Sequence, residues 1–240
     1  MKKIIAVLPT FNEAGNIRGV VSRIRALHEN VSVLVVDDDS PDGTADVVRE
    51  MARADPDVHL LLRTERRGRG YAGAAGFQWA LDNAFDLVVE MDADGSHPPE
   101  DVPALISAAA DAGVVVASRL VPGGGEQGRA PHRKFITSLA NLYIRLVLGL
   151  RVRDCTSGFR CFTRGALETV RPARLFSPGP AIVQEVLFLC ALHDLRVREI
   201  PFVFRERLGG TSKLKLKTLI GSLFDVWKIR RTYLPEKHTR

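Results

Sequence analysis

Short apolar runs alternate with amphipathic segments over the first half of the chain. The mostly apolar runs lie at residues 4–8, 31–36, 58–62, 86–91 and 114–118. The segments between them repeat apolar residues at helical spacing, at 16–28, 44–54, 70–84 and 103–112. Apolar strands between amphipathic helices are typical of parallel strands that are covered on both faces. The pattern therefore predicts an α/β fold with an open, mostly parallel sheet.

The pattern is less regular after residue 119. A stretch rich in Gly and Arg at 121–133 is predicted to be a mobile loop, and helices at 133–148 and 181–193 and a strand at 197–204 follow. From residue 216, apolar residues keep helical spacing among Lys and Arg, which predicts a basic amphipathic helix and tail over 216–240. We expect no transmembrane segment, since no run approaches about 18 uncharged apolar residues.

Polar residues gather where the predicted strands end. They occupy residues 9–13 after the first strand, 37–40 after the second, 92–96 after the fourth and Arg119 after the fifth. In an open α/β sheet the carboxyl ends of parallel strands meet at one edge, and ligands bind there. These four strand ends are therefore expected to form one site.

Two carboxylates stand one residue apart in LVVEMDADGSHPPE, where the fourth strand ends. Asp92 and Asp94 face the same side of an extended segment, because side chains alternate along it. Close carboxylates repel each other, and a divalent cation commonly offsets that repulsion. The spacing indicates a site for Mg²⁺ or Mn²⁺, although a solvated acidic turn has the same local sequence.

Charge and cysteine content narrow the function classes. The formal net charge is +6 and the pI is about 9.5, which favours an anionic partner such as a phosphorylated substrate, a membrane surface or nucleic acid. No nucleic-acid motif or aromatic-interleaved basic run is present, so we expect no nucleic acid. Three cysteines without CxxC pairing predict reduced thiols.

Six pieces occur in a characteristic order: PTFNE, VVDDDSPDGT, MDADGSHPPED, SR, DCTSGFR and GGTSKL. Together they resemble the inverting nucleotide-sugar glycosyltransferases of family 2, which have the GT-A fold. Within these, the chain most resembles the dolichyl-phosphate mannose synthases and related polyprenyl-phosphate glycosyltransferases. The resemblance runs from Pro9 to about Leu216, and it implies a GT-A catalytic domain over residues 1–215.

The resemblance also implies the site residues. Binding of the donor is implied for Pro9, Phe11, Glu13, Val36, Asp38, Asp92, Ala93, Arg207 and Lys213. The acceptor phosphate is implied to bind Arg119, Arg133 and Thr137, the metal to bind Asp92, Asp94 and Ser96, and the catalytic group to comprise Asp94, Arg119 and Arg133. Other readings stay open: Phe11 as a core aromatic, Asp38 as a turn cap, and the arginines as solvated surface charges. Glu185 matches a family glutamate, but the neighbouring Gln184 is one place off, so this helix has no assigned role. The basic segment 63–74 is interpreted as a turn near the site, also without a role.

The implied reaction moves mannose from GDP-mannose to a dolichyl or polyprenyl monophosphate. A phosphate acceptor is already anionic at neutral pH, so in-line displacement needs no general base and gives a β-linked product. His97 is then a packing residue of the turn. A UDP-sugar donor and a sugar hydroxyl acceptor are alternatives, and the hydroxyl would need a carboxylate base. A non-catalytic nucleotide-binding regulator is the alternative from another class.

A lipid acceptor requires contact with a bilayer. We expect a peripheral protein on the cytoplasmic face of a membrane. It would bind through helix 133–148 and the basic C-terminal helix with Trp227, or through a separate membrane-anchoring protein. Ordinary core helices with solvated basic faces are the alternative interpretation of both segments.

Overall fold

The computed structural model describes residues 2–205 and 216–234, and for residues 216–220 and 222 it describes the backbone alone. The strands are β1 (Ile4–Thr10), β2 (Val31–Asp37), β3 (Val58–Leu62), β4 (Leu87–Glu90), β5 (Val114–Ser118), β6 (Gly125–Gln127), β7 (Arg160–Thr163), β8 (Val197–Pro201) and β9 (Val203–Arg205). The α-helices are α1 (Ala14–Leu27), α2 (Thr44–Ala54), α3 (Arg69–Asp82), α4 (Val102–Ala108), α5 (Pro131–Leu148), α6 (Arg164–Val170), α7 (Ile182–Leu192) and α8 (Leu216–Tyr233). Two short 3₁₀ helices are η1 (Pro99–Asp101) and η2 (Pro172–Arg174).

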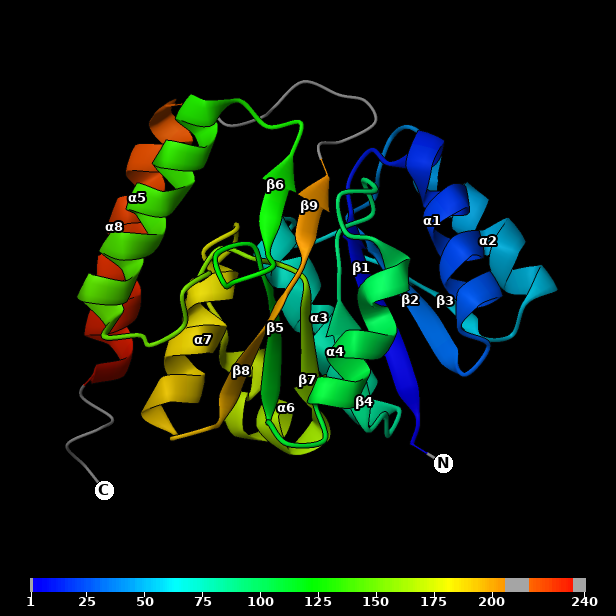
Figure 1. The fold of residues 1–240 in the computed structure, drawn as a ribbon. Helices are drawn as coiled ribbons and strands as arrows, with labels where there is room; N and C mark the ends of the chain where they lie inside the picture. Colours follow the sequence, from blue (N-terminus) through cyan, green and yellow to red (C-terminus); the bar gives the residue numbers. More distant parts are fainter. Residues whose placement is uncertain (1, 206–215, 235–240) are drawn as a thin grey trace.

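Seven strands form one sheet in the order β3-β2-β1-β4-β7-β5-β8 (Figure 1). The pairings in this sheet are parallel except those of β7, which runs antiparallel to β4 and β5. The predicted open, mostly parallel sheet is therefore confirmed. The sequence did not predict β7, because it is short and begins with the charged Arg160 inside the polar DCTSGFR segment.

The two faces of the sheet are buried under different helices. On β1, Ile5 and Val7 join one core cluster, with residues of α3, α5, α6, α7 and α8. Ile4, Ala6 and Leu8 join the other, with residues of α1, α2 and α4. Successive side chains of a strand point to opposite faces, so both faces must be apolar when both are covered. This two-sided burial is why the strands read as continuous apolar runs.

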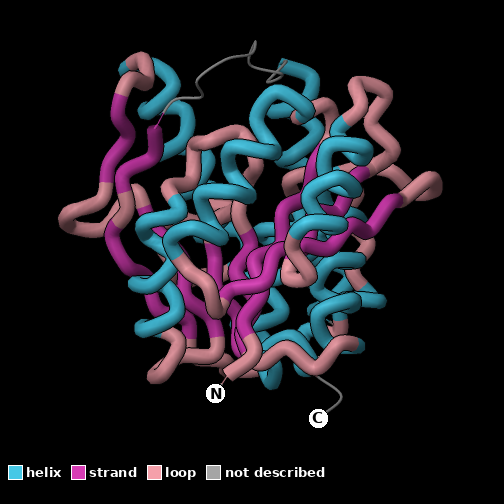
Figure 2. The backbone as a smooth tube through the Cα atoms, turned by 90° about the vertical axis from the view of Figure 1, so that its right-hand side faces the viewer, coloured by secondary structure: helices cyan, strands magenta, loops and turns pink. Residues whose placement is uncertain are grey.

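The carboxyl ends of the parallel strands share one edge of the sheet. The N-terminus lies at the bottom of Figure 1 and of Figure 2, which is turned by 90°, so these strands run upward and end toward the top. β1 lies between β2 and β4, so the crossovers leave it in opposite directions. This reversal is the position at which open α/β sheets bind ligands.

The segment predicted as a mobile loop at 121–133 contains a strand. Strand β6 pairs in parallel with β9, and Glu126 lies opposite Phe204 in that register. The single strand predicted at 197–204 is correspondingly divided into β8 and β9 around the buried Phe202. A three-residue strand whose partner lies about 80 residues away leaves no periodic signal in the sequence. Helix α6 was also not predicted, and α5 begins at Pro131, two residues earlier than expected.

Helix α8 packs against the rest of the fold. Val226, Ile229 and Tyr233 belong to the core cluster under α5 and α7, and the Tyr143 hydroxyl of α5 donates a hydrogen bond to the Leu223 carbonyl (3.0 Å). The division expected between residues 215 and 216 stays a prediction. Among the described helices, none is long and apolar enough to cross a bilayer.

The three cysteines are free thiols, as predicted. All are buried, and burial raises the pKa of Cys155, Cys161 and Cys190 to about 12. The thiols are therefore protonated at neutral pH.

A glycine in α3 sets how closely this helix approaches the sheet. A Cβ at Gly76 would lie 2.4 Å from Val7 Cγ1 and 3.1 Å from Val36 Cγ2, and both valines are fully buried. We expect Gly76→Ala to lower the free energy of unfolding by about 1–2 kcal/mol, because overpacking outweighs the gain in helix propensity. Gly19→Ala in α1 is the control, since nothing lies within 4 Å of its Cβ, and it should gain about 0.5–1 kcal/mol. Urea unfolding measures both, and equal gains in the two variants would contradict the prediction.

Candidate active site

The ends of β1 and β2 are fixed to each other by hydrogen bonds between the two loops that follow them. The backbone N–H of Asn12 donates to Ser40 Oγ (2.9 Å), and that of Glu13 donates to Thr44 Oγ1 (3.0 Å). Ala14 N–H donates to a carboxylate oxygen of Asp42 (2.9 Å). Residues far apart in the sequence thus form one rigid wall of the site.

Four of the predicted donor residues lie on or beside this wall. Pro9 pairs with Val36 in the parallel register of β1 and β2. Phe11 lies in the loop beyond them and is 43% exposed, which excludes its reading as a core aromatic. Glu13 accepts a hydrogen bond from the Asn16 side chain (2.8 Å) and precedes α1.

The three successive aspartates have three different environments. Asp37 is fully buried and accepts hydrogen bonds from the Ser40 N–H (2.9 Å) and the Thr10 hydroxyl (2.9 Å), so it is the residue that closes the turn. Asp38 pairs with Arg63 and accepts the Gly68 N–H (2.6 Å). Burial raises the pKa of the Asp38 carboxyl, against the opposing effect of these two partners. The residue that caps the turn is therefore Asp37 and not Asp38. Asp39 is exposed.

The pair of carboxylates at the end of β4 is held by short local contacts. Asp94 is buried and accepts a hydrogen bond from the Ser96 N–H (3.0 Å), with Gly95 between them at a φ of 79°. Asp92 is partly exposed, and its carboxylate accepts a hydrogen bond from Arg69 Nη2 (2.9 Å). Ala93 is buried. The expected third metal contact, Ser96, is thus adjacent to Asp94, with its side chain almost fully buried.

His97 packs beneath this turn, as predicted. Its ring stacks on Phe159 with centroids 5.0 Å apart, and its Nδ1 accepts the Asp92 N–H (2.9 Å). Burial lowers the pKa of His97. A neutral imidazole whose Nδ1 is already an acceptor holds the Asp92 backbone in place.

Two buried groups that the sequence did not single out stand directly behind the carboxylates. Glu90 and Arg160 are fully buried and lie opposite each other on β4 and β7, with Arg160 Nε donating to Glu90 Oε2 (2.9 Å). Arg69 Nη1 reaches Glu90 Oε1 (3.4 Å) as well as Asp92, so it links the buried pair to the site. The basic segment 63–74 therefore has a role. The signal for it was the charged Glu90 inside an apolar strand, which requires a buried partner.

A glycine allows the DCTSGFR segment to approach Arg69. A Cβ at Gly158 would lie 2.4 Å from Arg69 Nη2 and 3.8 Å from the Asp92 carboxylate. Gly158 therefore lies against the Arg69 guanidinium and close to Asp92, and a side chain at this position would require Arg69 to move.

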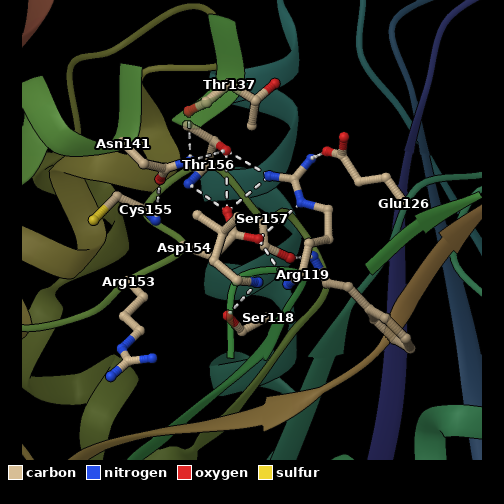
Figure 3. A network of polar contacts seen from close by, with 12 residues as sticks. Ser118, Arg119, Glu126, Thr137, Asn141, Arg153, Asp154, Cys155, Thr156 and Ser157 are labelled. Carbon is tan, nitrogen blue, oxygen red and sulfur yellow. Dashed lines mark hydrogen bonds and ion pairs between the residues drawn. The ribbon is translucent and has the colours of Figure 1, made fainter. Parts of the chain in front are cut away.

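Arg119 and Asp154, the first residue of this segment, form the second charged centre (Figure 3). Arg119 donates from Nε to Asp154 Oδ2 (2.8 Å) and from Nη2 to Oδ1 (2.7 Å), and its backbone N–H also donates to Oδ2 (3.0 Å). Nη2 also donates to Thr156 Oγ1 (2.5 Å). Burial alone would raise the pKa of Asp154, but the hydrogen bonds and charge of Arg119 hold it below its ordinary value.

Asn141 connects helix α5 to the same centre. Its side-chain Nδ2 donates to the Thr137 carbonyl (2.9 Å) and to Thr156 Oγ1 (3.3 Å), while Oδ1 accepts the Cys155 N–H (2.6 Å) (Figure 3). The structure thus brings Thr137 beside the Arg119 centre. Arg133 lies one turn before Thr137 on α5 and is partly buried. Arg207 and Lys213 lie outside the described residues.

Glu185 forms hydrogen bonds with a different set of residues. It is fully buried and accepts hydrogen bonds from the Phe176 and Ser177 N–H groups (3.0 and 2.9 Å) and from the Tyr233 hydroxyl (2.6 Å). These bonds join α7 to the preceding loop and to α8. The matching family glutamate therefore has a structural explanation in this chain.

The donor atoms at the end of β4 fit a hard divalent cation in part. Asp92 and Asp94 offer two carboxylates, the ligands that Mg²⁺ and Mn²⁺ favour. Among the described residues, no group of three or more His, Cys, Asp or Glu side chains could hold a metal ion. A cation here would therefore take its remaining oxygens from other groups, such as a hydroxyl, water or a bound phosphate.

Comparison with known proteins relates this geometry to a family. Residues 5–171 match the model described as glycosyl transferase family 2. An undecaprenyl-phosphate mannosyltransferase from Micrococcus luteus is 40% identical over 212 residues, which cover 88% of this chain and 87% of that protein. A polyprenol monophosphomannose synthase from Mycolicibacterium smegmatis is 37% identical over 233 residues, which cover 95% of this chain and 88% of that protein. The resemblance drawn from the motifs is confirmed.

Solved structures confirm the expected fold. A glucosyl-3-phosphoglycerate synthase from Mycobacterium tuberculosis, in complex with Mn²⁺, UDP and glucosyl-3-phosphoglycerate, superposes with a TM-score of 0.67 at 21% identity, covering 95% of this chain and 78% of that one. A mannosyltransferase from Pyrobaculum calidifontis, in complex with GDP-Man and Mn²⁺, gives a TM-score of 0.57 at 24% identity, covering 88% of this chain and 58% of that one.

Replacing Asp154 tests the buried Arg119 pair through its pH dependence. We expect Asp154→Asn to lower the free energy of unfolding at pH 7 by about 3–5 kcal/mol, because it removes the fully buried carboxylate that accepts three hydrogen bonds from Arg119. The carboxyl has a lowered pKa in the folded state, so its contribution is complete above its ordinary value near pH 4. It is lost as the pH falls through the folded-state pKa. The deficit of the variant measured by urea unfolding should therefore shrink below about pH 4.

Asp111→Asn is the matched control, since this exposed residue pairs with exposed Arg198 at 3.5 Å. It should change stability by less than about 0.5 kcal/mol. A deficit of Asp154→Asn that stays constant on acidification would refute the electrostatic explanation.

Proposed function

Because the chain belongs to glycosyl transferase family 2, we propose that it transfers mannose from GDP-mannose to a polyprenyl monophosphate such as dolichyl phosphate. The observation that carries the proposal is the identity of this chain, 40% and 37% over most of both chains, to an undecaprenyl-phosphate mannosyltransferase and a polyprenol monophosphomannose synthase. The positions of the carboxylate pair and the Arg119 centre at one sheet edge support it.

The donor belongs at the ends of β1, β2 and β4. The nucleotide is assigned to the ends of β1 and β2, at Pro9, Phe11, Glu13, Val36 and Asp38. The donor residues that follow β4 are Asp92, Ala93 and Asp94. Asp92 and Asp94 would hold the Mg²⁺ or Mn²⁺ ion, with Ser96 beside them, and the ion would neutralise charge on the leaving diphosphate. Arg207 and Lys213 remain assigned to the donor by resemblance.

The acceptor phosphate belongs at the Arg119 centre. Its oxygen attacks the anomeric carbon, a new carbon–oxygen bond forms, and the bond to the diphosphate breaks with its electron pair leaving on GDP. Attack in line opposite the leaving group inverts an α-linked donor to a β-linked product. Arg119, Arg133 and Thr137 would orient the phosphate, which is the main requirement when no proton has to be removed. His97 is consistent with a reaction that needs no general base. Burial lowers the pKa of its imidazole, and its Nδ1 already accepts a hydrogen bond from the Asp92 N–H.

The alternative functions differ from this proposal in the sugar donor, in the acceptor or in being non-catalytic. A sugar hydroxyl acceptor would need a free carboxylate as base, whereas Asp154 and Glu126 in this region are both paired with arginines. A UDP-sugar donor fits the same fold, and the donor assay below separates it. A regulator without activity is disfavoured by the high identity to named transferases.

The lipid acceptor would be reached through helices α5 and α8, which lie side by side along one edge of the molecule (Figure 1). Their exposed large apolar residues are Phe135, Ile136, Leu139, Leu142, Leu146, Leu223, Phe224 and Trp227. Exposed Lys134, Lys228 and Arg231 accompany them. Apolar residues flanked by basic ones suit the interface of an anionic bilayer. We propose peripheral binding at the cytoplasmic face, with or without a membrane-anchoring protein, and residues 1–215 as the catalytic domain.

The transfer itself is tested with purified protein, Mn²⁺, a short polyprenyl phosphate and either GDP-mannose or UDP-glucose. We expect a mannosyl product with GDP-mannose as the donor and no transfer product with UDP-glucose. Asp94→Ala should lower the rate about 10²–10³-fold, because a bound ion would stabilise the charge that develops on the leaving diphosphate by several kcal/mol. Excess chelator should have the same effect. Asp82→Ala, an exposed residue at the end of α3, is the control. Transfer from UDP-glucose alone would reject the mannose assignment, and full activity of Asp94→Ala would reject the metal role.

Membrane binding is tested by sedimentation with vesicles that contain anionic lipid. We expect Leu146→Asp and Phe224→Asp, at residues 73% and 72% exposed, each to weaken binding about 10-fold or more. Leu27→Asp is the control, since this exposed leucine lies at the end of α1 on the other side of the molecule (Figure 1). Equal binding of all three variants and the unmodified protein would remove these helices from the proposal.

A further inference from the structure

Two arginines share one carboxylate beside the proposed acceptor site. Glu126 Oε1 lies 3.4 Å from Arg119 Nη1 and 2.5 Å from Arg129 Nη1. The Glu126 side chain is only 6% exposed. Its other oxygen, Oε2, is buried and has no hydrogen-bond partner among the described residues. This carboxylate is therefore enclosed by cationic groups but only half satisfied.

The remaining nitrogens of Arg119 are occupied. Nε and Nη2 bind Asp154, and Nη2 also binds Thr156, which leaves Nη1 directed at Glu126 (Figure 3). Asp154 differs from Glu126, because both of its oxygens accept hydrogen bonds and its side chain is fully buried. Asp154 is thus the fully hydrogen-bonded counter-ion of Arg119, and Glu126 is the half-satisfied one.

Phe204 keeps the two arginines together. Its ring centroid lies 5.8 Å from Arg119 Cζ and 5.7 Å from Arg129 Cζ, and its backbone lies opposite Glu126 in the β6–β9 register. A shared aromatic surface holds guanidinium groups without using their N–H donors. Both Nη1 groups remain available to an oxyanion once Glu126 moves.

We propose that Arg129 is a further ligand of the acceptor phosphate, and that the Glu126 carboxylate occupies the place of the phosphate until the substrate arrives. This inference rests on the proposed function. The charges of Arg119, Arg129, Asp154 and Glu126 sum to zero, so these four groups together offer a phosphate no net positive charge while Glu126 stays. Displacing Glu126 leaves a net positive charge whose guanidinium N–H groups suit phosphate oxygens.

The proposal predicts opposite effects of two substitutions. Glu126→Gln removes the competing charge and should tighten the binding of inorganic phosphate, and of a short polyprenyl phosphate, about 10-fold. Arg129→Gln removes a ligand and should weaken both about 10-fold. Isothermal titration calorimetry with each probe measures this directly, without any transfer reaction.

Two surface variants control for net charge. Glu168→Gln makes the same charge change as Glu126→Gln at an exposed residue paired with Arg164, and Arg198→Gln matches Arg129→Gln at the exposed pair with Asp111. Both should stay within about twofold of the unmodified protein. Thermal unfolding establishes that each variant is folded, and Arg129→Gln carries the test if Glu126→Gln is not.

Two results would overturn the proposal. In one, phosphate binding by Glu126→Gln or Arg129→Gln does not differ from that of its control. In the other, the affinity for GDP changes instead of that for the phosphate probes, which would assign these arginines to the donor. Mannose transfer by the unmodified protein is measured in parallel, so either result is distinguishable from failure of the proposed function.

Discussion

The buried ion pair between Glu90 and Arg160 is the interaction on which the site depends. Both residues are fully buried in the middle of the sheet and lie opposite each other on β4 and β7. Neither charge could remain there alone, because an unpaired buried charge costs several kcal/mol. The pair therefore favours one register of the antiparallel strand β7. That register places Gly158, two residues before β7, against Arg69 and close to Asp92, which follows β4.

Charge balance continues outward from this pair. Arg69 bridges Glu90 and Asp92, and Gly158 makes room for its guanidinium. Arg119 is held by Asp154 in the same manner, and Asn141 ties this centre to α5. Asp92 is thus oriented by an arginine that contacts the fully buried Glu90, and Arg119 by the fully buried Asp154. Such preorganisation suits a transfer in which positioning and electrostatic stabilisation do most of the work.

The two helices at the edge of the fold combine core packing with an apolar exterior. Tyr233 and Ile229 bury one side of α8 under α7 and α5, while Phe224 and Trp227 remain exposed on it. The two readings of these helices, core or interface, therefore do not exclude each other. Their inner side stabilises the domain, and α5 also carries Thr137 and Asn141 toward the Arg119 centre. The lipid-facing surface we propose is consequently part of the same element as the acceptor site.

Local patterns in the sequence determined the parallel strands, the helices between them and the acidic turn at Asp92 and Asp94. Two-sided burial produces apolar runs, and the polar residues at strand ends lie at one edge, so these features needed no knowledge of distant contacts. The motif resemblance likewise pointed to the correct family. What only the tertiary structure decided is which residues become partners. The sequence could not place β7, the β6–β9 pair, or the partners of Arg69, Arg119 and Glu126. The separations in sequence range from 3 residues, between Glu126 and Arg129, to 78 residues, between the paired positions of β6 and β9. Neither periodicity nor composition records which opposite charge a buried group will meet.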